Sequence, residues 1–139
     1  MNCGKSRLLK IGRLRKIKFK KGYYLYVGSA LKSIEKRVCR HLRDSKKIFW
    51  HIDYLLAADR VKIDSVYYVE NNKKLECAIS EKIKVIAIPV DGFGSSDCNC
   101  KSHLFYISEK SLYEVNKLLR QYNFNIVGAA VFLKSFCKL

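Results

Sequence analysis

The sequence GYYLYVGSA, at residues 22–30, is the part of the chain from which the fold can be inferred most directly. Aromatic and β-branched residues favour strands, so residues 23–27 predict a strand that Gly28 ends, letting the chain turn closely into the next element. Successive side chains of a strand point to opposite faces. Tyr24 and Tyr26 are therefore expected on one face of this strand.

The segment before it, residues 9–19, alternates in the same way. Ile17 and Phe19 are predicted to face inward, while Lys16, Lys18 and Lys20 occupy the opposite face. A turn is expected at residues 21–22. The two strands, 9–19 and 23–27, are predicted to form a hairpin.

A helix is predicted from residue 34 to about residue 46, because Ser33 is a suitable N-cap and Glu35 lies in the first turn. Strands and helices then mix along the chain, which indicates an α+β domain over residues 1–139 with a small mixed or antiparallel sheet flanked by helices. The remaining expectations are helices at 49–58, 74–83 and 112–121, strands at 61–70, 85–90, 104–107 and 126–136, and a loop at 91–102.

Positive charge is concentrated in the first third of the chain. The net charge is +16, and residues 1–47 contain 16 Lys and Arg against two acids, a net charge of +14. Focused charge of this kind indicates a polyanionic partner, although a solvated basic surface remains the alternative. An anionic membrane is less favoured, since the segment lacks a basic amphipathic anchor with large aromatics. The predicted nucleic-acid contacts are Lys18, Lys20, Lys21, Arg40, Arg43, Lys46, Lys47 and His51, with Arg40 and Arg43 turned toward solvent.

The sequence predicts a soluble, cytoplasmic protein. No apolar run approaches the roughly 20 residues that a membrane helix needs, and residues 1–10 lack the apolar core of a signal peptide. The six cysteines do not form the dense framework of a small secreted domain. We therefore expect reduced thiols, with or without a metal, in preference to disulfides.

Arg37 and His41 are four residues apart on the predicted helix, so they share one flank. Together with Tyr24 and Tyr26, they would bring phenols, a guanidinium and an imidazole close to each other. Phosphodiester cleavage uses a base for water, a cation for the developing phosphorane charge and a carboxylate that holds a metal. The alternative is that the tyrosines are ordinary strand residues and that Arg37 and His41 form a solvated helix flank.

Residues 26–30 (YVGSA), followed by residues 35–37 and 40–41, resemble the second half of the motif of GIY-YIG nucleases together with its helix arginine. The resemblance implies that Tyr26 lies near the attacking water and that Arg37 contacts the scissile phosphate. The carboxylate implied as the ligand of a divalent Mg or Mn ion is Glu76. With Tyr24 and His41, these residues form the predicted catalytic set.

A closer resemblance is to an uncharacterised branch, domain of unknown function 123, whose members are sometimes fused to endonuclease III. It rests on four segments: residues 11–14 (IGRL), 22–30, 50–55 (WHIDYL) and 92–98 (GFGSSDC). The first Gly-x-Tyr strand of GIY-YIG nucleases has no counterpart in residues 1–10. We expect that the chain begins after this strand or lacks it, and that a truncated first strand leaves a sheet edge open.

A second group of residues is suited to a metal. Cys98, Cys100 and His103 lie close together in one loop, and Cys77 on the preceding helix is a candidate fourth ligand. Thiolates with an imidazole suit zinc in a closed tetrahedral site. The alternative is a turn with reduced cysteines and a hydrogen-bonded histidine.

The sequence therefore predicts a nucleic-acid-binding protein, with DNA favoured over RNA, that acts as a divalent-metal-dependent endonuclease in DNA repair or processing. Two alternatives remain open. One is a non-catalytic nucleic-acid-binding module, and the other is a domain stabilised by zinc.

Overall fold

The computed structural model describes residues 1–70 and 75–137. Its largest sheet is antiparallel and has the strand order β5 (Val61–Lys62), β1 (Asn2–Cys3), β4 (Gly22–Tyr26), β8 (Leu104–Ile107), β7 (Ile88–Pro89). Two smaller antiparallel sheets pair β2 (Arg7–Ile11) with β3 (Arg15–Phe19), and β6 (Ser65–Tyr68) with β9 (Asn125–Gly128). The helices are α1 (Ile34–Leu42), α2 (His51–Leu56), α3 (Glu76–Ile83), α4 (Glu109–Gln121) and α5 (Ala129–Phe136).

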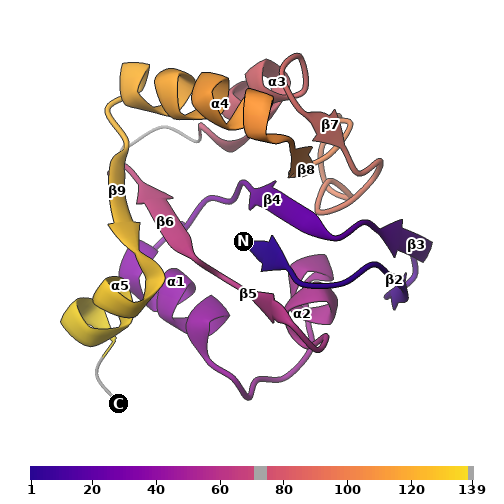
Figure 1. The fold of residues 1–139 in the computed structure, drawn as a ribbon. Coiled ribbons are helices and arrows are strands. Elements are labelled where there is room, and N and C mark those ends of the chain that lie inside the picture. The colour runs from indigo at the N-terminus through magenta and orange to yellow at the C-terminus, as the bar shows by residue number, and fades with distance from the viewer. Residues whose placement is uncertain (71–74, 138–139) are drawn as a thin grey trace.

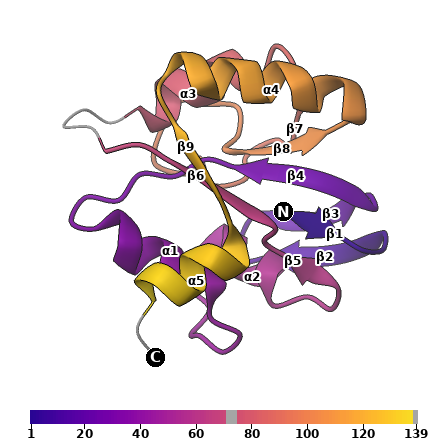
Figure 2. The same cartoon turned by 60° about the vertical axis from the view of Figure 1, so that its left-hand side comes forward.

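Helices cover both faces of the main sheet, which confirms the α+β prediction (Figures 1 and 2). Helices α3 and α4 lie on one face, and α1 and α2 lie on the other. Strand β8 separates two apolar cores, because Leu104 packs with the core of α2 while Phe105 packs with the core of α3 and α4. This alternation along one strand is the expected result of burial on both faces.

The predicted hairpin of 9–19 with 23–27 is wrong. Strand β4 pairs with β1 and β8, and the segment that was expected to be one strand is itself a hairpin of β2 and β3. The chain reverses at residues 12–14, where Gly12 has φ +49° and the Leu14 amide donates to the Ile11 carbonyl. Ile17 and Phe19 are buried, as predicted.

Several other elements are shorter than expected. The first helix starts at its Ser33 N-cap as predicted but ends at Leu42, because the Arg43 backbone is extended and the Lys46 ammonium donates to carbonyls of the last turn. The strands predicted at 61–70 and 85–90 are reduced to β5 with β6 and to β7. The predicted start of the helix at residue 74 lies outside the described residues. The expected loop at 91–102, strand at 104–107 and helix at 112–121 are confirmed.

The prediction of a single strand over residues 126–136 is wrong. The chain leaves β9 at Gly128 and continues as α5. Phe132 is the buried residue of this helix, and its ring contacts Tyr68 on β6 and Phe136 one turn later. An apolar run without a clear period does not distinguish a strand from a buried helix.

Strand β1 lies inside the sheet, between β4 and β5, so it is not itself the open edge that was expected. Its register with β4 is short, joining Asn2 to Tyr23 and Cys3 to Gly22. Among the described residues, the rest of β4 has a strand partner only on the β8 side. Residues 23–26 of β4 also line a cavity.

Cys39 on α1 is bonded to Cys137 at the end of α5, which corrects the expectation of reduced thiols in preference to disulfides for these two residues. The two residues are 98 positions apart in the sequence, so their proximity could not be inferred from spacing. The bond fastens the C-terminal helix beside α1 (Figure 2). The remaining described cysteines, Cys3, Cys77, Cys98 and Cys100, are free thiols.

Reduction of this disulfide is expected to lower the free energy of unfolding by about 2–4 kcal/mol, because closing a long loop restricts the unfolded chain. Urea unfolding with and without a reductant measures the change. Cys137→Ser should show the same lower midpoint in both conditions. An unchanged midpoint for the reduced wild-type chain would contradict this expectation.

Among residues 1–70 and 75–137, no helix is both long and apolar enough to cross a membrane.

Candidate active site and metal-ligating cluster

A cavity of about 720 Å³ lies beside β4, with α1 and α3 contributing to its wall. The five residues of the predicted catalytic set, Tyr24, Tyr26, Arg37, His41 and Glu76, are all among its lining residues. Apolar side chains from β6, α1 and α4 form much of the remaining wall. Concave sites with a few convergent polar groups are typical of ligand-binding pockets.

Tyr26 and Arg37 lie close together, because a Cβ on Gly28 would lie within 3.6 Å of both side chains. Burial raises the pKa of Tyr26, the charge of Arg37 opposes this, and Glu76 raises the pKa further. Gly28 permits this close approach, because a Cβ there would lie 3.1 Å from an Arg37 guanidinium nitrogen. Tyr26 therefore remains a protonated phenol near neutral pH and can donate a hydrogen bond into the cavity.

The His41 ring lies 6.0 Å from the Tyr26 ring and 5.6 Å from the Trp50 ring, measured between centroids. Burial, followed by the charge of Arg37, lowers the pKa of His41 to about 4. Neither ring nitrogen has a hydrogen-bond partner among the described residues. His41 is thus a neutral imidazole at pH 7, with a nitrogen available as an acceptor once the cavity holds water or a ligand.

Tyr24 does not interact with Tyr26, Arg37 or His41 through its hydroxyl, which is hydrogen-bonded elsewhere. Its side chain is buried, and its hydroxyl donates to the Lys20 carbonyl over 2.8 Å. Its ring packs edge-on against Phe19 and Tyr106. The structure therefore places Tyr24 in the core that supports β4, while Tyr26 is the phenol beside Arg37.

Trp50 positions the arginines of α1. The guanidinium carbon of Arg37 lies 4.6 Å from the centre of the Trp50 ring, and that of Arg40 lies 4.5 Å from it. Arg37 also donates to the Ser29 carbonyl. Stacking on an aromatic ring restricts a guanidinium to a few orientations.

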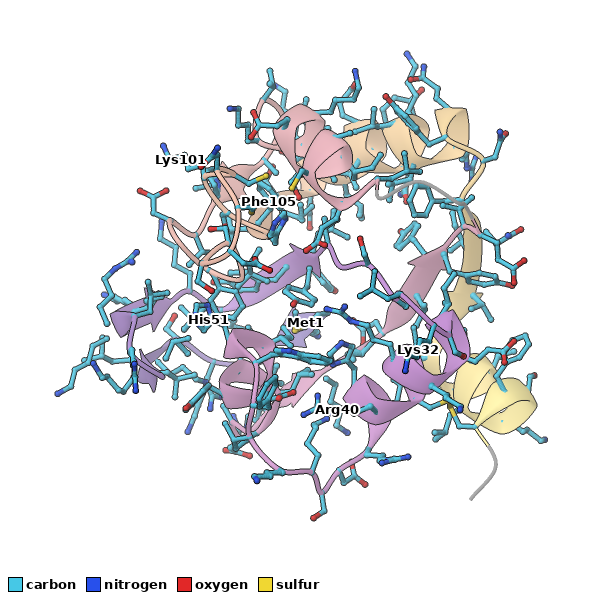
Figure 3. The ribbon with its side chains drawn as sticks, turned by 180° about the vertical axis from the view of Figure 1, so that it is seen from behind. Met1, Lys32, Arg40, His51, Lys101 and Phe105 are labelled. Atoms are coloured by element: carbon cyan, nitrogen blue, oxygen red, sulfur yellow. A yellow bond between two sulfur atoms is a disulfide. The ribbon has the colours of Figure 1, made fainter. Side chains whose placement is uncertain are left out.

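Arg40 does not turn toward solvent as expected. It donates to both carboxylate oxygens of Asp53, over 2.9 and 2.8 Å, and Asp53 is fully buried. The Phe49 and Trp50 amides donate to the same carboxylate. Figure 3 labels Arg40, which belongs to α1, and shows Met1 near the middle of the molecule.

Two more of the predicted nucleic-acid contacts have partners within the protein. Lys46 donates to the carbonyls of Arg40, His41 and Arg43 at the end of α1. His51 accepts a hydrogen bond from the Gly94 amide over 2.8 Å. The other predicted contacts are exposed: Lys18, Lys20, Lys21, Arg43 and Lys47.

Replacing Asp53 with Asn is expected to lower the free energy of unfolding by about 3–5 kcal/mol, because the change leaves the half-buried Arg40 charge without its partner. Burial alone would raise the pKa of Asp53, but hydrogen bonds from Arg40, Trp50 and Phe49 hold it at about 2. Its stabilising effect is therefore complete above pH 3.8 and disappears as the pH falls through 2.

Chemical denaturation of Asp53→Asn and wild type at pH 7 and pH 2 measures this effect. Asp59→Asn is the matched control, because Asp59 forms an ion pair with Lys5 in which both side chains are exposed. Equal stability losses for the two variants at pH 7 would contradict the role assigned to the buried carboxylate.

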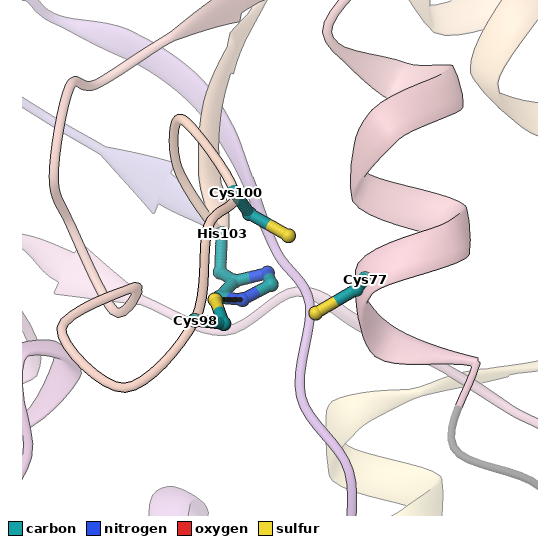
Figure 4. Close-up of side chains that lie close together, drawn as sticks. All are labelled: Cys77, Cys98, Cys100 and His103. Carbon is teal, nitrogen blue, oxygen red and sulfur yellow. Dashed lines mark hydrogen bonds between the residues drawn. The ribbon is translucent and has the colours of Figure 1, made fainter.

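Cys77, Cys98, Cys100 and His103 come together as the sequence predicted. One potential ligand atom from each residue lies within 4.8 Å of all the others. Figure 4 shows Cys98, Cys100 and His103 projecting from one loop toward Cys77 on α3. In a tetrahedral zinc site with Zn–S bonds of about 2.3 Å, neighbouring sulfurs are about 3.8 Å apart. A contraction of about 1 Å would complete such a geometry, so this cluster could hold a metal ion.

The orientation of His103 fits a ligand role. The side chain is buried, and its Nδ1 lies 2.6 Å from the Ser80 hydroxyl. Its Nε2 faces the cluster, 3.2 Å from the Cys98 sulfur. Metal-binding histidines commonly have the other ring nitrogen fixed by a hydrogen bond in this way. Burial and then the neighbouring thiols raise the pKa of Cys100 to about 12, a penalty that a bound cation would offset.

The cluster and the cavity meet at Glu76. Its carboxylate oxygen lies 3.5 Å from His103 Nε2, and Glu76 also lines the cavity beside Tyr26. Gly94 packs between the two groups, because a Cβ there would lie 3.3 Å from both the Tyr26 ring and the His103 Cβ. Its φ of +71° further favours glycine. The loop that presents the thiols therefore also packs against Tyr26.

Asp53 and Ser80 are partners of site residues that were not predicted from the sequence. Asp53 lies three residues after Trp50 at the start of α2, where a carboxylate that caps the helix could have been anticipated. Ser80 is one turn after Cys77 on α3, but no local signal connects it with His103, which is 23 residues away.

Comparison with known families assigns the chain to one of them. Residues 1–124 match the family described as domain of unknown function DUF123, and the chain belongs to this family. The matched region contains the cavity and the cluster, whereas Cys137 and α5 lie beyond it. No curated protein and no solved structure matches the chain.

Proposed function

We propose that this protein is a nucleic-acid-binding, divalent-metal-dependent phosphodiester hydrolase with a GIY-YIG-like site, acting in DNA repair or processing. The observation that carries the proposal is the presence of Tyr26, Arg37, His41 and Glu76 in the lining of one cavity, with Arg37 and His41 close to Tyr26. These side chains come from three separate elements, β4, α1 and α3. A solvated helix flank would not require this proximity of Tyr26 and Arg37.

The chemistry of each group supports a distinct task. Arg37, held by Trp50 and Ser29, can bind the scissile phosphate and stabilise its developing charge. Tyr26 can donate a hydrogen bond to the attacking water or a phosphate oxygen. His41, neutral at pH 7, can accept a proton as the water attacks.

Glu76 is the residue that would hold Mg or Mn. One carboxylate together with substrate phosphates is a common way to bind Mg²⁺. When bound, such an ion would offset phosphate charge and polarise the attacking water. The Glu76 carboxylate lies 3.5 Å from His103 Nε2 and would pair with it only if that nitrogen carried a proton. A metal ion bound to His103 Nε2 would exclude this proton. The Glu76 carboxylate would then be available to a Mg or Mn ion in the cavity.

We also propose that the Cys77, Cys98, Cys100 and His103 cluster binds one zinc ion with a structural role. The buried His103, with Ser80 fixing its second nitrogen, supports this assignment. Four protein ligands would leave no open position, which is typical of structural rather than catalytic zinc. Zinc would fasten the Gly94 loop to α3, and it would thereby hold Glu76 near the cavity.

The proposal is tested with labelled single-stranded, duplex and branched DNA and with RNA, in the presence of Mg²⁺ or Mn²⁺. Metal-dependent cleavage is expected for wild type and for Glu35→Gln, whose exposed carboxylate lies on α1. Glu76→Gln should lose it while retaining the wild-type zinc content. Salt-sensitive binding without cleavage by wild type would leave a non-catalytic binding module and overturn the enzyme proposal.

A further inference from the structure

The β2–β3 hairpin presents a strongly basic face. Six of its 13 residues are Lys or Arg, and the first acidic residue of the chain is Glu35. No salt bridge involves these six among residues 1–70 and 75–137. The face turned away from the core carries Lys10, Lys16 and Lys18, which are all exposed.

The pairing of the two strands brings like charges together. Lys10 lies directly opposite Lys16, and Lys18 lies opposite the exposed Leu8. Like charges directly opposite each other destabilise an antiparallel pair. The hairpin is nevertheless well anchored, because Ile11, Ile17 and Phe19 on its other face are buried in the core. It is an ordered ribbon whose charge is suited to an external polyanion.

We propose that the β2–β3 hairpin is a ribbon arm that docks in the major groove of duplex DNA. A two-stranded ribbon fits the B-form major groove, which is about 12 Å wide. The major groove of A-form RNA is too deep and narrow for such readout. Proteins that bind single strands use exposed aromatic side chains for stacking, but the one aromatic residue of the hairpin, Phe19, is buried.

The position of the arm agrees with the proposed cleavage site, on which this inference rests for its substrate. Strand β4 begins at Gly22, soon after the hairpin ends, and reaches Tyr26, so its four residue steps span about 13 Å at roughly 3.3 Å per residue. This length corresponds to about four base pairs at 3.4 Å each along one strand. The arm would thus hold a duplex within about half a helical turn of the phosphate at Arg37.

The test compares Lys10→Gln/Lys16→Gln/Lys18→Gln with a control of equal charge change, Lys110→Gln/Lys117→Gln/Lys134→Gln, whose lysines are exposed on α4 and α5. Fluorescence anisotropy without added divalent cations measures binding to a 20-base-pair DNA duplex, its single strand, an RNA duplex and phosphatidylserine vesicles. We expect wild type to prefer duplex DNA. The arm variant should bind it at least 10-fold more weakly, with a salt slope reduced by about 2–3, whereas the control should change less than 3-fold.

Equal weakening by both variants would overturn the arm, as would wild-type preference for single strands, RNA or vesicles. Cleavage assays with Mg²⁺ separate this outcome from failure of the proposed function. If duplex binding depends on the arm but no cleavage occurs, the result supports the arm proposal and contradicts the proposed hydrolase activity. If wild type cleaves DNA and the arm variant binds it as tightly as wild type, the result supports the hydrolase activity and contradicts the arm proposal.

Discussion

Removal of the zinc ion proposed for the Cys77, Cys98, Cys100 and His103 cluster is expected to lower the free energy of unfolding by about 4 kcal/mol or more. This is the stabilisation that a ligand gives when it is present at about 1,000 times its dissociation constant. The loss is large because the loop containing three of the ligands has no regular secondary structure of its own. For a chain of this size it corresponds to a fall in melting temperature of roughly 10 °C.

Elemental analysis of the purified protein should give one zinc per chain. Thermal unfolding before and after treatment with a strong chelator measures its effect. Cys98→Ser should contain little zinc and melt near the chelated wild type, whereas Cys3→Ser, which changes a free cysteine outside the cluster, should retain the metal. A metal-free wild-type protein whose melting temperature is unaffected by chelation would contradict the zinc assignment.

The cluster of Cys77, Cys98, Cys100 and His103 shows how far spacing could predict the site. Cys98, Cys100 and His103 are close in sequence, so a single loop brings them together whatever the rest of the fold. The contribution of Cys77 required α3 to pack beside this loop, and the sequence indicated the helix without fixing its packing. The partner of His103 Nδ1 depends on the same packing and was not predictable.

The predictions for the hairpin and for the cysteines were wrong for a related reason. Local alternation identified Ile17 and Phe19 as buried, but it did not show that the chain reverses at Gly12 or that β4 takes β8 as its neighbour. The bond between Cys39 and Cys137 joins elements 98 residues apart. Periodicity reports which face of an element is buried, whereas partner choice depends on long-range packing.

Arg40 illustrates the same limit at the candidate site. Helical spacing placed it away from Arg37 and His41, which suggested a solvent-facing side chain. The buried Asp53 carboxylate on α2 instead holds it against Trp50. The predicted flank of Arg37 and His41 was described correctly because it depends on one helix alone.

Replacing Arg37 with Ala is expected to reduce the rate of cleavage at saturating protein by about 10²–10³-fold, the usual effect of removing one donor to a developing oxyanion. Nucleic-acid affinity should change by less than about 3-fold, since many other basic residues contribute to binding. Arg37→Lys should recover only part of the rate, because an ammonium lacks the planar fork that stacks on Trp50 and donates to Ser29.

Single-turnover cleavage with Mg²⁺ or Mn²⁺, together with metal-free binding, separates these effects. Lys36→Ala is the matched control, because Lys36 is exposed on the same helix and its loss changes the charge by the same amount. If both variants weaken binding equally and leave the saturating rate unchanged, Arg37 contributes only to the general positive field. If Arg37→Ala alone loses the rate with its affinity intact, the guanidinium acts on the transition state, as its fixed position between Tyr26, Ser29 and Trp50 leads us to expect.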